Sequence, residues 1–296
     1  MPEIISHQAR ELTLAAIAED FSTASDVSAA LLPIPSKHVS SRVVPRQPGI
    51  IAGLTMGIEV VREFNTRLHD HLEFVPSQRY CDGAFVELNA EIAKLSGPLR
   101  AVLTAERTLL NFLCRMSGVA TLTRKFVDRA KAANPTVNIY DTRKTIPGWR
   151  ELDKYAVRCG GGCNHRFGLY DAVLLKDNHI AGIPPAELAK AISAMLCKIT
   201  GQPKFVEVEV DTLEQLHAVL GVDGVNIILL DNFTLADMKT AVSMRDAAGA
   251  RGRVELEASG GVTLETVADI ASTGVDRIAV GAITHSAPAL DIGLDL

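Results

Sequence analysis

The chain has 296 residues, of which 47% are hydrophobic and 22% charged, and its formal net charge is −5. These values are typical of a globular protein with one large domain or two ordinary ones. They argue against a nucleic-acid-binding protein, which needs a basic face over much of its surface. We therefore expect small-molecule partners rather than nucleic acid.

The sequence also argues against a membrane or secreted protein. No segment reaches the run of about 18 apolar residues that a membrane-spanning helix needs, and the first residues lack the basic region of a signal peptide. The five cysteines stand at irregular spacings, which favours reduced thiols and a cytoplasmic location. Cys159, Cys163 and His165 suggest zinc, but no second close ligand pair accompanies them, so we favour small loop residues beside glycines.

The first third of the chain predicts a mixed α+β region. Helical patterns cover residues 8–20 and 56–64, and short strands are expected at 39–44, 72–75, 84–88 and 99–103, separated by turns rich in Pro, Gly and Ser. Such short strands with tight turns predict a mostly antiparallel sheet. Residues 105–133 then repeat apolar side chains at helical spacing, which suggests a pair of helices linking two domains, with Gly118 as a close-packing point or a break. On this pattern alone Arg107 is a surface charge.

From residue 137 onward, strands and helices alternate regularly. The predicted strands are 137–140, 172–175, 205–210, 225–230, 254–257 and 277–280, and the predicted helices are 185–199, 212–220, 234–248 and 263–272. Repeated strand–helix units indicate a parallel sheet. No Gly-x-Gly-x-x-Gly follows the first of these strands, so we favour an α/β barrel over a dinucleotide-binding fold. Six strands predict a short or irregular barrel.

Residues 141–180 concentrate positive charge in an acidic protein. Two short apolar strands there end in charged residues, Asp141-Thr-Arg143-Lys144 after the first and Lys176-Asp-Asn-His179 after the second. Each cation alone could be a solvated surface charge. Together, at the ends of successive strands, they favour a pocket for a small, multiply charged anion.

Acids and glycines follow the later strands. Glu207 and Glu209 share one face of a strand because alternate residues point the same way, and Asp231 ends the next strand. The segment 259–261 (Ser-Gly-Gly) before a helix expected to open at Thr263, and Gly281 after the last strand, are typical of phosphate binding in α/β barrels. The acids could hold sugar hydroxyls or a divalent cation, or form structural ion pairs.

These motifs resemble the quinolinate phosphoribosyltransferase family, of the type II phosphoribosyltransferases. The matching stretches are AERTLLNFLCRMSGVAT, DTRKTIPGWRELDKYAVRCGGGCNHRFGLYDAVLLKDNHI, VEVEVDTLEQL, IILLDNF, LEASGGVT and GVDRIAVGAITHSAPALD, in family order from about residue 98 to the C-terminus. The resemblance implies transfer of a phosphoribosyl group from phosphoribosyl pyrophosphate to quinolinate with loss of carbon dioxide. The products are nicotinate mononucleotide and pyrophosphate, in de novo NAD biosynthesis.

The resemblance also implies roles for particular residues. Quinolinate would contact Arg107, Arg143, His165 and Arg166. The expected catalytic residues are Lys144, Lys176, Glu209 and Asp231, which would also contact the phosphoribosyl group together with Ser259, Gly260, Gly261 and Gly281. Magnesium is the implied cofactor, held by Glu209 and Asp231 and largely through substrate and water.

The implied architecture has an N-terminal α/β sandwich (residues 1–116), an incomplete seven-stranded α/β barrel (117–283) and a C-terminal tail (284–296) that returns to the N-terminal domain. The implied assembly is a homodimer or a hexamer of dimers, with Arg107 reaching the neighbouring subunit's site.

Three alternatives remain open at this point. The chain could be a phosphoribosyltransferase-like paralogue, such as the one associated with molybdenum transport, acting on another base. It could be a barrel aldolase or isomerase with Lys144 or Lys176 as a Schiff base, or a non-catalytic binding protein. The complete Asn164-His165-Arg166 and Lys176–His179 motifs favour quinolinate, and a pure binder needs no pairing of acids with cations at strand ends.

Overall fold

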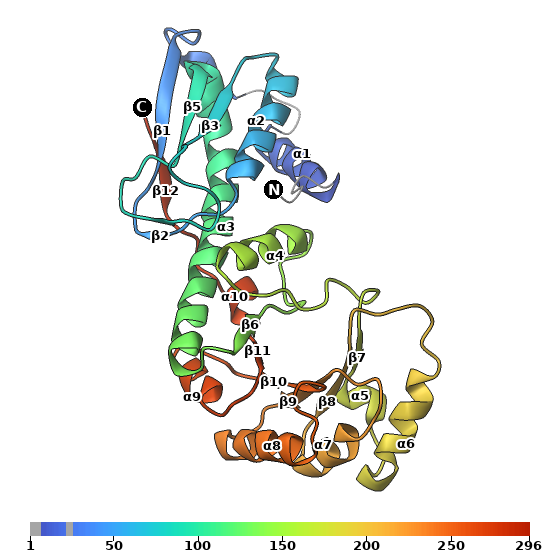
Figure 1. Ribbon diagram of the computed structural model, residues 1–296. Helices are drawn as coiled ribbons and strands as arrows, with labels where there is room; N and C mark the ends of the chain where they lie inside the picture. Colours follow the sequence, from blue (N-terminus) through green and yellow to red (C-terminus); the bar gives the residue numbers. More distant parts are fainter. Residues whose placement is uncertain (1–6, 22–25) are drawn as a thin grey trace. The chain divides into compact units, whose positions relative to one another are not determined.

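The computed structural model describes residues 7–21 and 26–296, so the first six residues of the expected N-terminal domain lie outside the described part (Figure 1). The chain divides into two compact units that interleave along the sequence. One comprises Met1–Arg124, Thr145–Gly161 and Ile283–Leu296, and the other comprises Lys125–Lys144 and Gly162–Ala282. The division expected at residues 116–117 and 283–284 stays a prediction.

The first unit contains a four-stranded antiparallel sheet in the order β12-β1-β5-β3. The strands of this unit are β1 (His38–Pro45), β2 (Gly49–Ile50), β3 (Glu73–Pro76), β4 (Phe85–Val86), β5 (Ala93–Pro98) and β12 (Ile292–Asp295). Its helices are α1 (His7–Phe21), η1 (Ala29–Leu31), α2 (Leu54–Leu68), α4 (Arg150–Cys159) and the first part of α3 (Leu99–Ala133), and α10 (Ala282–His285) begins at the boundary. Strand β12, at the C-terminal end, pairs with β1 with Leu294 opposite Val43. The antiparallel character expected of this region is confirmed.

Helix α3 corrects two expectations. It is one helix of 35 residues that continues through Gly118, so the expected pair of helices is wrong. It also begins at Leu99, so the strand expected at residues 99–103 is wrong, and the strand lies just before it, in β5. A short apolar run fits either a buried strand or the buried face of a helix, and here Ala101 and Val102 are buried in the helix.

Gly118 is a point of close packing. A Cβ atom there would lie 2.1 Å from the Pro288 carbonyl oxygen and 2.9 Å from the Ala289 Cα. Both are backbone atoms and cannot rotate away, so only glycine lets the C-terminal segment pass this close to α3.

Gly118→Ala is therefore expected to lower the free energy of unfolding by about 2–3 kcal/mol, the range for overpacking a rigid interior. Denaturant titration of both proteins measures the change. Gly221→Ala is the matched control, since its Cβ would meet nothing within 4 Å and its φ is −88°; it is expected to change stability by less than about 0.5 kcal/mol. Equal effects of the two substitutions would contradict the packing explanation.

The second unit contains a six-stranded parallel sheet in the order β6-β11-β10-β9-β8-β7. Its strands are β6 (Asn138–Tyr140), β7 (Val173–Leu175), β8 (Val206–Val210), β9 (Ile227–Asp231), β10 (Glu255–Ser259) and β11 (Arg277–Ala279). All six lie within the predicted ranges or one or two residues beyond them. Its helices are α5 (Asp177–Ile180), α6 (Pro185–Leu196), α7 (Leu213–Leu220), α8 (Leu235–Ala247) and α9 (Val267–Ala271).

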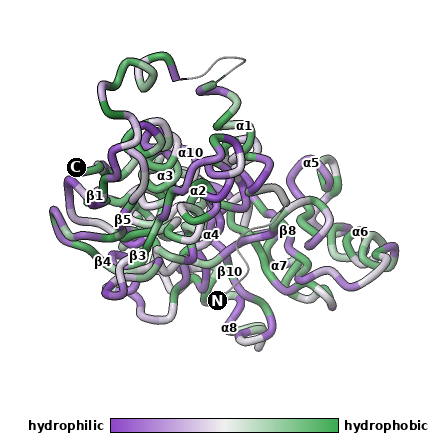
Figure 2. The backbone as a smooth tube through the Cα atoms, turned by 90° about the horizontal axis from the view of Figure 1, so that it is seen from above, coloured by the Kyte–Doolittle hydropathy of each residue, from purple (hydrophilic) through white to green (hydrophobic). Residues whose placement is uncertain are grey.

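The sheet is an incomplete barrel. Tyr140 of β6 forms a single parallel bridge with Cys163, and within the described residues this bridge takes the place of the seventh strand that the resemblance implied. Helices α6, α7 and α8 cover one side of the sheet (Figure 1). Figure 2 shows hydrophobic and hydrophilic residues along α6, as expected of a helix with one buried face, on which Leu188 and Ile192 are buried.

No helix in the described ranges is both long and apolar enough to cross a bilayer. All six barrel strands run in the same direction, so their carboxyl ends lie at one edge. This edge is where the charged residues of the sequence motifs meet.

Candidate active site

A cavity of about 260 Å³ opens at the carboxyl ends of the barrel strands. The residues that line it are Thr142, Arg143, Lys144, His165, Arg166, Leu174, Lys176, Glu209, Leu229, Asp231, Glu257, Ser259 and Ala279. Eight of these were expected as site residues from the sequence. The structure thus brings the predicted cations and acids into one cavity.

The strand order explains why these side chains converge. Arg143 and Lys144 follow β6, Lys176 follows β7, and Asp231 ends β9. Glu209 lies in β8 with its side chain on the inner face. Because neighbouring parallel strands end together, residues that are far apart in sequence meet at one rim.

One part of the cavity is cationic. Arg166 is 8% exposed, and burial together with the nearby charge of Arg143 lowers the pKa of its guanidinium. Two guanidinium groups that repel one another in a partly desolvated cavity favour a bound dianion, which relieves the repulsion and accepts their N–H groups.

The cavity also contains two carboxylates, Glu209 and Asp231. Lys176 donates from Nζ to Glu209 Oε2 at 2.9 Å. Burial raises the pKa of Asp231, and the charges of Glu209 and Asp211 raise it further. Asn232 donates from its side-chain amide to Asp231 Oδ2 at 2.7 Å. Two carboxylates in mutual repulsion suit a group that carries or develops positive charge, and their oxygen atoms are ligands that Mg²⁺ accepts.

The expected phosphate loop has the required backbone. Ser259 lines the cavity, and Gly260 and Gly261 have φ of 101° and 57°. A Cβ on Gly260 would lie 2.1 Å from Asn232 Oδ1, so the loop needs glycine there. The helix expected to open at Thr263 begins only at Val267, because residues 264–266 form a turn. Gly281 precedes α10 and is not among the described lining residues.

A neighbouring cavity of about 400 Å³ lies over residues 211–214 and 232–234. Its described lining residues include Asp211, Glu214 and Asp237 but no basic side chain. It therefore does not suit an anionic substrate, although it is the larger of the two.

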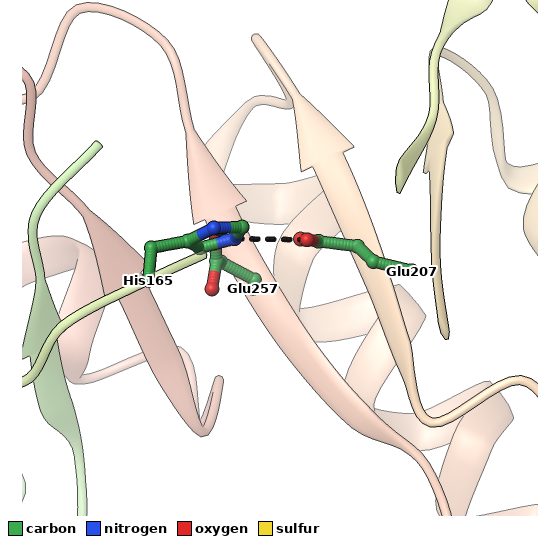
Figure 3. A group of neighbouring side chains, drawn as sticks. All are labelled: His165, Glu207 and Glu257. Carbon is green, nitrogen blue, oxygen red and sulfur yellow. Dashed lines mark ion pairs between the residues drawn. The ribbon is translucent and has the colours of Figure 1, made fainter. Parts of the chain in front are cut away.

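A buried cluster lies beneath the cationic part of the active-site cavity. His165 Nε2 lies 2.8 Å from Glu207 Oε2 and 3.4 Å from Glu257 Oε1 (Figure 3). Both glutamates are fully buried. Among the described residues, these three form the only group of three or more His, Cys, Asp or Glu side chains that is close enough to share a metal ion. Cys159 and Cys163 are not part of it, so zinc binding by these cysteines gains no support. The sequence placed Glu207 on the inner face with Glu209 but gave no sign of its contact with His165.

The pKa values of all three groups in this cluster are shifted, those of His165 and Glu207 upward and that of Glu257 downward. Burial lowers the pKa of His165, but hydrogen bonds with Glu207 and Glu257 outweigh it and raise the pKa to about 9. Burial and the charge of Glu257 raise the pKa of Glu207. Burial alone would raise the pKa of Glu257, but His165 and Arg277 lower it. The Arg166 backbone N–H donates to His165 Nδ1 at 2.8 Å, a bond that favours the neutral ring and so opposes this rise in pKa.

The raised pKa of His165 predicts a pH-dependent stability. The folded protein binds the His165 proton more tightly than the unfolded chain, whose histidine titrates near 6.5. The free energy of unfolding should therefore decrease as pH rises from 6.5 to about 9, by up to about 3 kcal/mol. Denaturant titrations across this range, compared between wild type and His165→Asn, measure the contribution. His217→Asn on the exposed side of α7 should keep the wild-type slope, and an unchanged slope in His165→Asn would contradict the assignment.

Arg107, also expected at the site, lies on α3 in the first unit and is exposed. The cavity residues all belong to the second unit. A role for Arg107 therefore stays a prediction.

The fold and the cavity define an α/β-barrel enzyme for a small anionic substrate, with facing cations and carboxylates at the carboxyl ends of the strands. Comparisons with known proteins narrow this class. Residues 26–117 match the model of the quinolinate phosphoribosyl transferase N-terminal domain, and residues 119–295 match that of its C-terminal domain.

Individual relatives agree with this match. A nicotinate-nucleotide pyrophosphorylase [carboxylating] of Mycobacterium leprae is 43% identical over 97% of both chains. The quinolinate phosphoribosyltransferase [decarboxylating] 1b of Nicotiana tabacum is 39% identical over 95% of this chain and 80% of its own. The structure of a nicotinate-nucleotide pyrophosphorylase from Francisella tularensis superposes with a TM-score of 0.84 at 38% identity, covering 97% of this chain and 95% of its own. The chain belongs to the quinolinate phosphoribosyltransferase family.

Proposed function

We propose that this protein transfers the phosphoribosyl group of phosphoribosyl pyrophosphate to quinolinate, releasing pyrophosphate and carbon dioxide and forming nicotinate mononucleotide for NAD biosynthesis. The observation that carries the proposal is a single cavity lined both by guanidinium groups and by carboxylates and lysines. Its two guanidinium groups suit a dicarboxylate, and its carboxylates and lysines suit a phosphorylated sugar.

Quinolinate would bind through Arg143 and Arg166. Guanidinium groups meet carboxylates with two parallel, charge-assisted hydrogen bonds, which fix the ring as well as attract it. Arg107 of a neighbouring subunit is proposed to add a further cation. This contact presupposes the homodimer, or hexamer of dimers, implied by the family resemblance.

Phosphoribosyl pyrophosphate would bind near the two carboxylates. Lys144 and Lys176 are proposed to meet phosphate oxygens, and Ser259, Gly260, Gly261 and Gly281 to hold the 5-phosphate. As the C1–O bond to pyrophosphate breaks, positive charge develops on the ribose. Glu209 and Asp231 lie in the same cavity, where their negative charge would stabilise that state.

The quinolinate ring nitrogen then forms the new bond to C1 and becomes cationic. The adjacent carboxylate leaves as carbon dioxide, and its bonding electrons stay on the ring carbon, stabilised by the neighbouring positive nitrogen. Protonation of that carbon completes the product. No covalent nucleophile is needed, so the protein's work is to orient the ring and stabilise charge.

Magnesium fits the two carboxylates of the cavity. Glu209 and Asp231 offer carboxylate oxygens. The pKa of Asp231 is raised by burial and by the charge of Glu209, and a bound cation would offset both effects. When bound, the ion would supply positive charge to the pyrophosphate oxygens, held largely through substrate and water. We further propose a cytoplasmic location, in keeping with five free cysteines in the described structure.

The proposal is tested by incubating the purified protein with quinolinate, phosphoribosyl pyrophosphate and magnesium. Nicotinate mononucleotide and carbon dioxide should form in equal amounts. Parallel reactions with nicotinate in place of quinolinate distinguish a paralogue that acts on another base. Product from nicotinate alone, or no product from folded protein with quinolinate, would overturn the proposal.

A further inference from the structure

The buried cluster beneath the cavity leaves neither ring nitrogen of His165 available to a substrate. Nε2 faces the carboxylates of Glu207 and Glu257, and Nδ1 accepts the Arg166 backbone N–H. Figure 3 shows the His165 ring with one nitrogen directed at Glu207 and with Glu257 beside the ring. The direct contact with quinolinate that the sequence suggested would require one of these bonds to open.

The cluster instead fixes the segment that carries Arg166. The Asp141 carboxylate accepts from the His165 backbone N–H at 2.8 Å and from the Asn164 side-chain amide at 2.6 Å. Just before this segment, Cys163 is bridged to β6. The His165 side chain also links the segment to β8 and β10, through Glu207 and Glu257. The backbone at Arg166 is thus tied to three strands, and its side chain enters the cavity.

The position of Arg277 indicates that the cluster is a set of ion pairs between side chains rather than a metal site. The ligand atoms of His165, Glu207 and Glu257 lie within 4.8 Å of one another, which alone would suit a cation. However, Arg277 Nε donates to Glu257 Oε2 at 2.6 Å, and its guanidinium lies 3.7 Å from the centre of the Tyr140 ring. The Arg277 side chain is only 7% exposed. A divalent ion here would lie next to a buried guanidinium, so side-chain positive charge already balances the carboxylates.

We propose that His165 is a positioning residue that acts through Arg166. Its imidazole ties the Asn164–Arg166 segment to the buried carboxylates of Glu207 and Glu257 and thereby fixes the Arg166 guanidinium for a substrate carboxylate. The inference rests on the proposed function only in naming quinolinate as that substrate. It assigns Glu207, Glu257 and Arg277, which no motif singled out for binding, to the support of substrate affinity.

A double-mutant cycle on binding tests the proposal. Quinolinate dissociation constants are measured by calorimetry for wild type, His165→Asn, Arg166→Ala and the double variant. Asparagine keeps an acceptor near the Nδ1 position but removes the link to the glutamates. His165→Asn is expected to weaken binding about 10-fold in the wild-type protein and less than about 2-fold in the Arg166→Ala background. The same loss in both backgrounds would show an independent substrate contact and overturn the proposal.

A variant of the Glu257 carboxylate provides a second test of the proposal. Glu257→Gln keeps the size of the side chain and removes its charge, and it should weaken quinolinate binding about 5-fold or more while leaving the KM for phosphoribosyl pyrophosphate within about 2-fold. Glu255→Gln is the matched control, since Glu255 also pairs with Arg277 but is half exposed and does not contact His165. Wild-type affinity in Glu257→Gln would overturn the proposal.

Folding of each variant is checked by near-UV circular dichroism. If His165→Asn does not fold, Glu257→Gln replaces it in the cycle, because it removes a carboxylate that holds the imidazole and leaves the ring in place. The same non-additivity is expected. Because binding is measured without turnover, the cycle remains separate from the activity assay that tests the proposed function.

Discussion

Asp231→Asn is expected to lower kcat by about 10²- to 10³-fold, the range for loss of one charged stabiliser from an active site. The protein should nevertheless stay at least as stable as the wild type. Burial and the charges of Glu209 and Asp211 raise the pKa of Asp231, so its ionised form is held against repulsion. Asparagine removes that repulsion, and its carbonyl can still accept from Asn232, which now donates to Asp231 Oδ2 at 2.7 Å.

The measurement is kcat at saturating substrates and magnesium, together with thermal denaturation of the free protein. Asp211→Asn is the matched control. Asp211 is exposed and lies outside the active-site cavity, yet it acts on the same carboxylate. It is expected to keep kcat within about 2-fold, as for other exposed charges. Wild-type turnover in Asp231→Asn, or a large loss of stability, would contradict the role given to this carboxylate.

The barrel strands were predictable because buried parallel strands are near-continuous apolar runs. The segment Ile227–Leu230 is apolar throughout and fully buried in β9. Strand β5 was not predictable for the opposite reason. Its sequence, Ala-Lys-Leu-Ser-Gly-Pro, has little β propensity, and it is a strand because β1 and β3 pair with it on both sides.

The sequence singled out Gly118 as unusual within a helical pattern but left open whether the helix packs closely or breaks there. Glycine inside an apolar helical pattern indicates either close packing or a break. The deciding fact is the passage of residues 288–289 against α3, a contact between segments about 170 residues apart. Helix α4 was not predicted, because its buried residues Leu152, Ala156 and Val157 are interspersed with charged ones in a segment dominated by cations.

The candidate site was predictable at its rim but not at its base. Strand ends are visible in sequence, so Lys176, Glu209 and Asp231 could be placed together. The contact of His165 with Glu207 and Glu257 depends on the folded sheet, which brings β8 and β10 beside the segment after Cys163. Such an arrangement follows from sheet geometry rather than from spacing, and no single-sequence pattern specifies it.

Arg143→Ala is expected to weaken quinolinate binding about 10²-fold, as for truncation of one partner of a desolvated charge pair. The free protein should not lose stability, because the charge of Arg143 lowers the pKa of Arg166 and the two guanidinium groups repel one another. Calorimetry gives the dissociation constant, and thermal denaturation with and without quinolinate gives the stabilisation by ligand. That stabilisation should be large in the wild type and small in the variant.

Arg143→Lys separates charge from geometry, since lysine keeps the positive charge but not the two-pronged donor pattern of guanidinium. Affinity about 10-fold below wild type is expected. If alanine and lysine weaken binding equally, the donor pattern rather than the charge determines affinity; if neither does, quinolinate does not use this part of the cavity.

The cavity holds two pairs of like charges, Asp231 with Glu209 and Arg143 with Arg166, and their repulsion destabilises the free protein. A substrate that neutralises these charges removes the repulsion, and this gain adds to its affinity. Substitutions at these positions should therefore lower affinity or turnover without lowering the stability of the free protein.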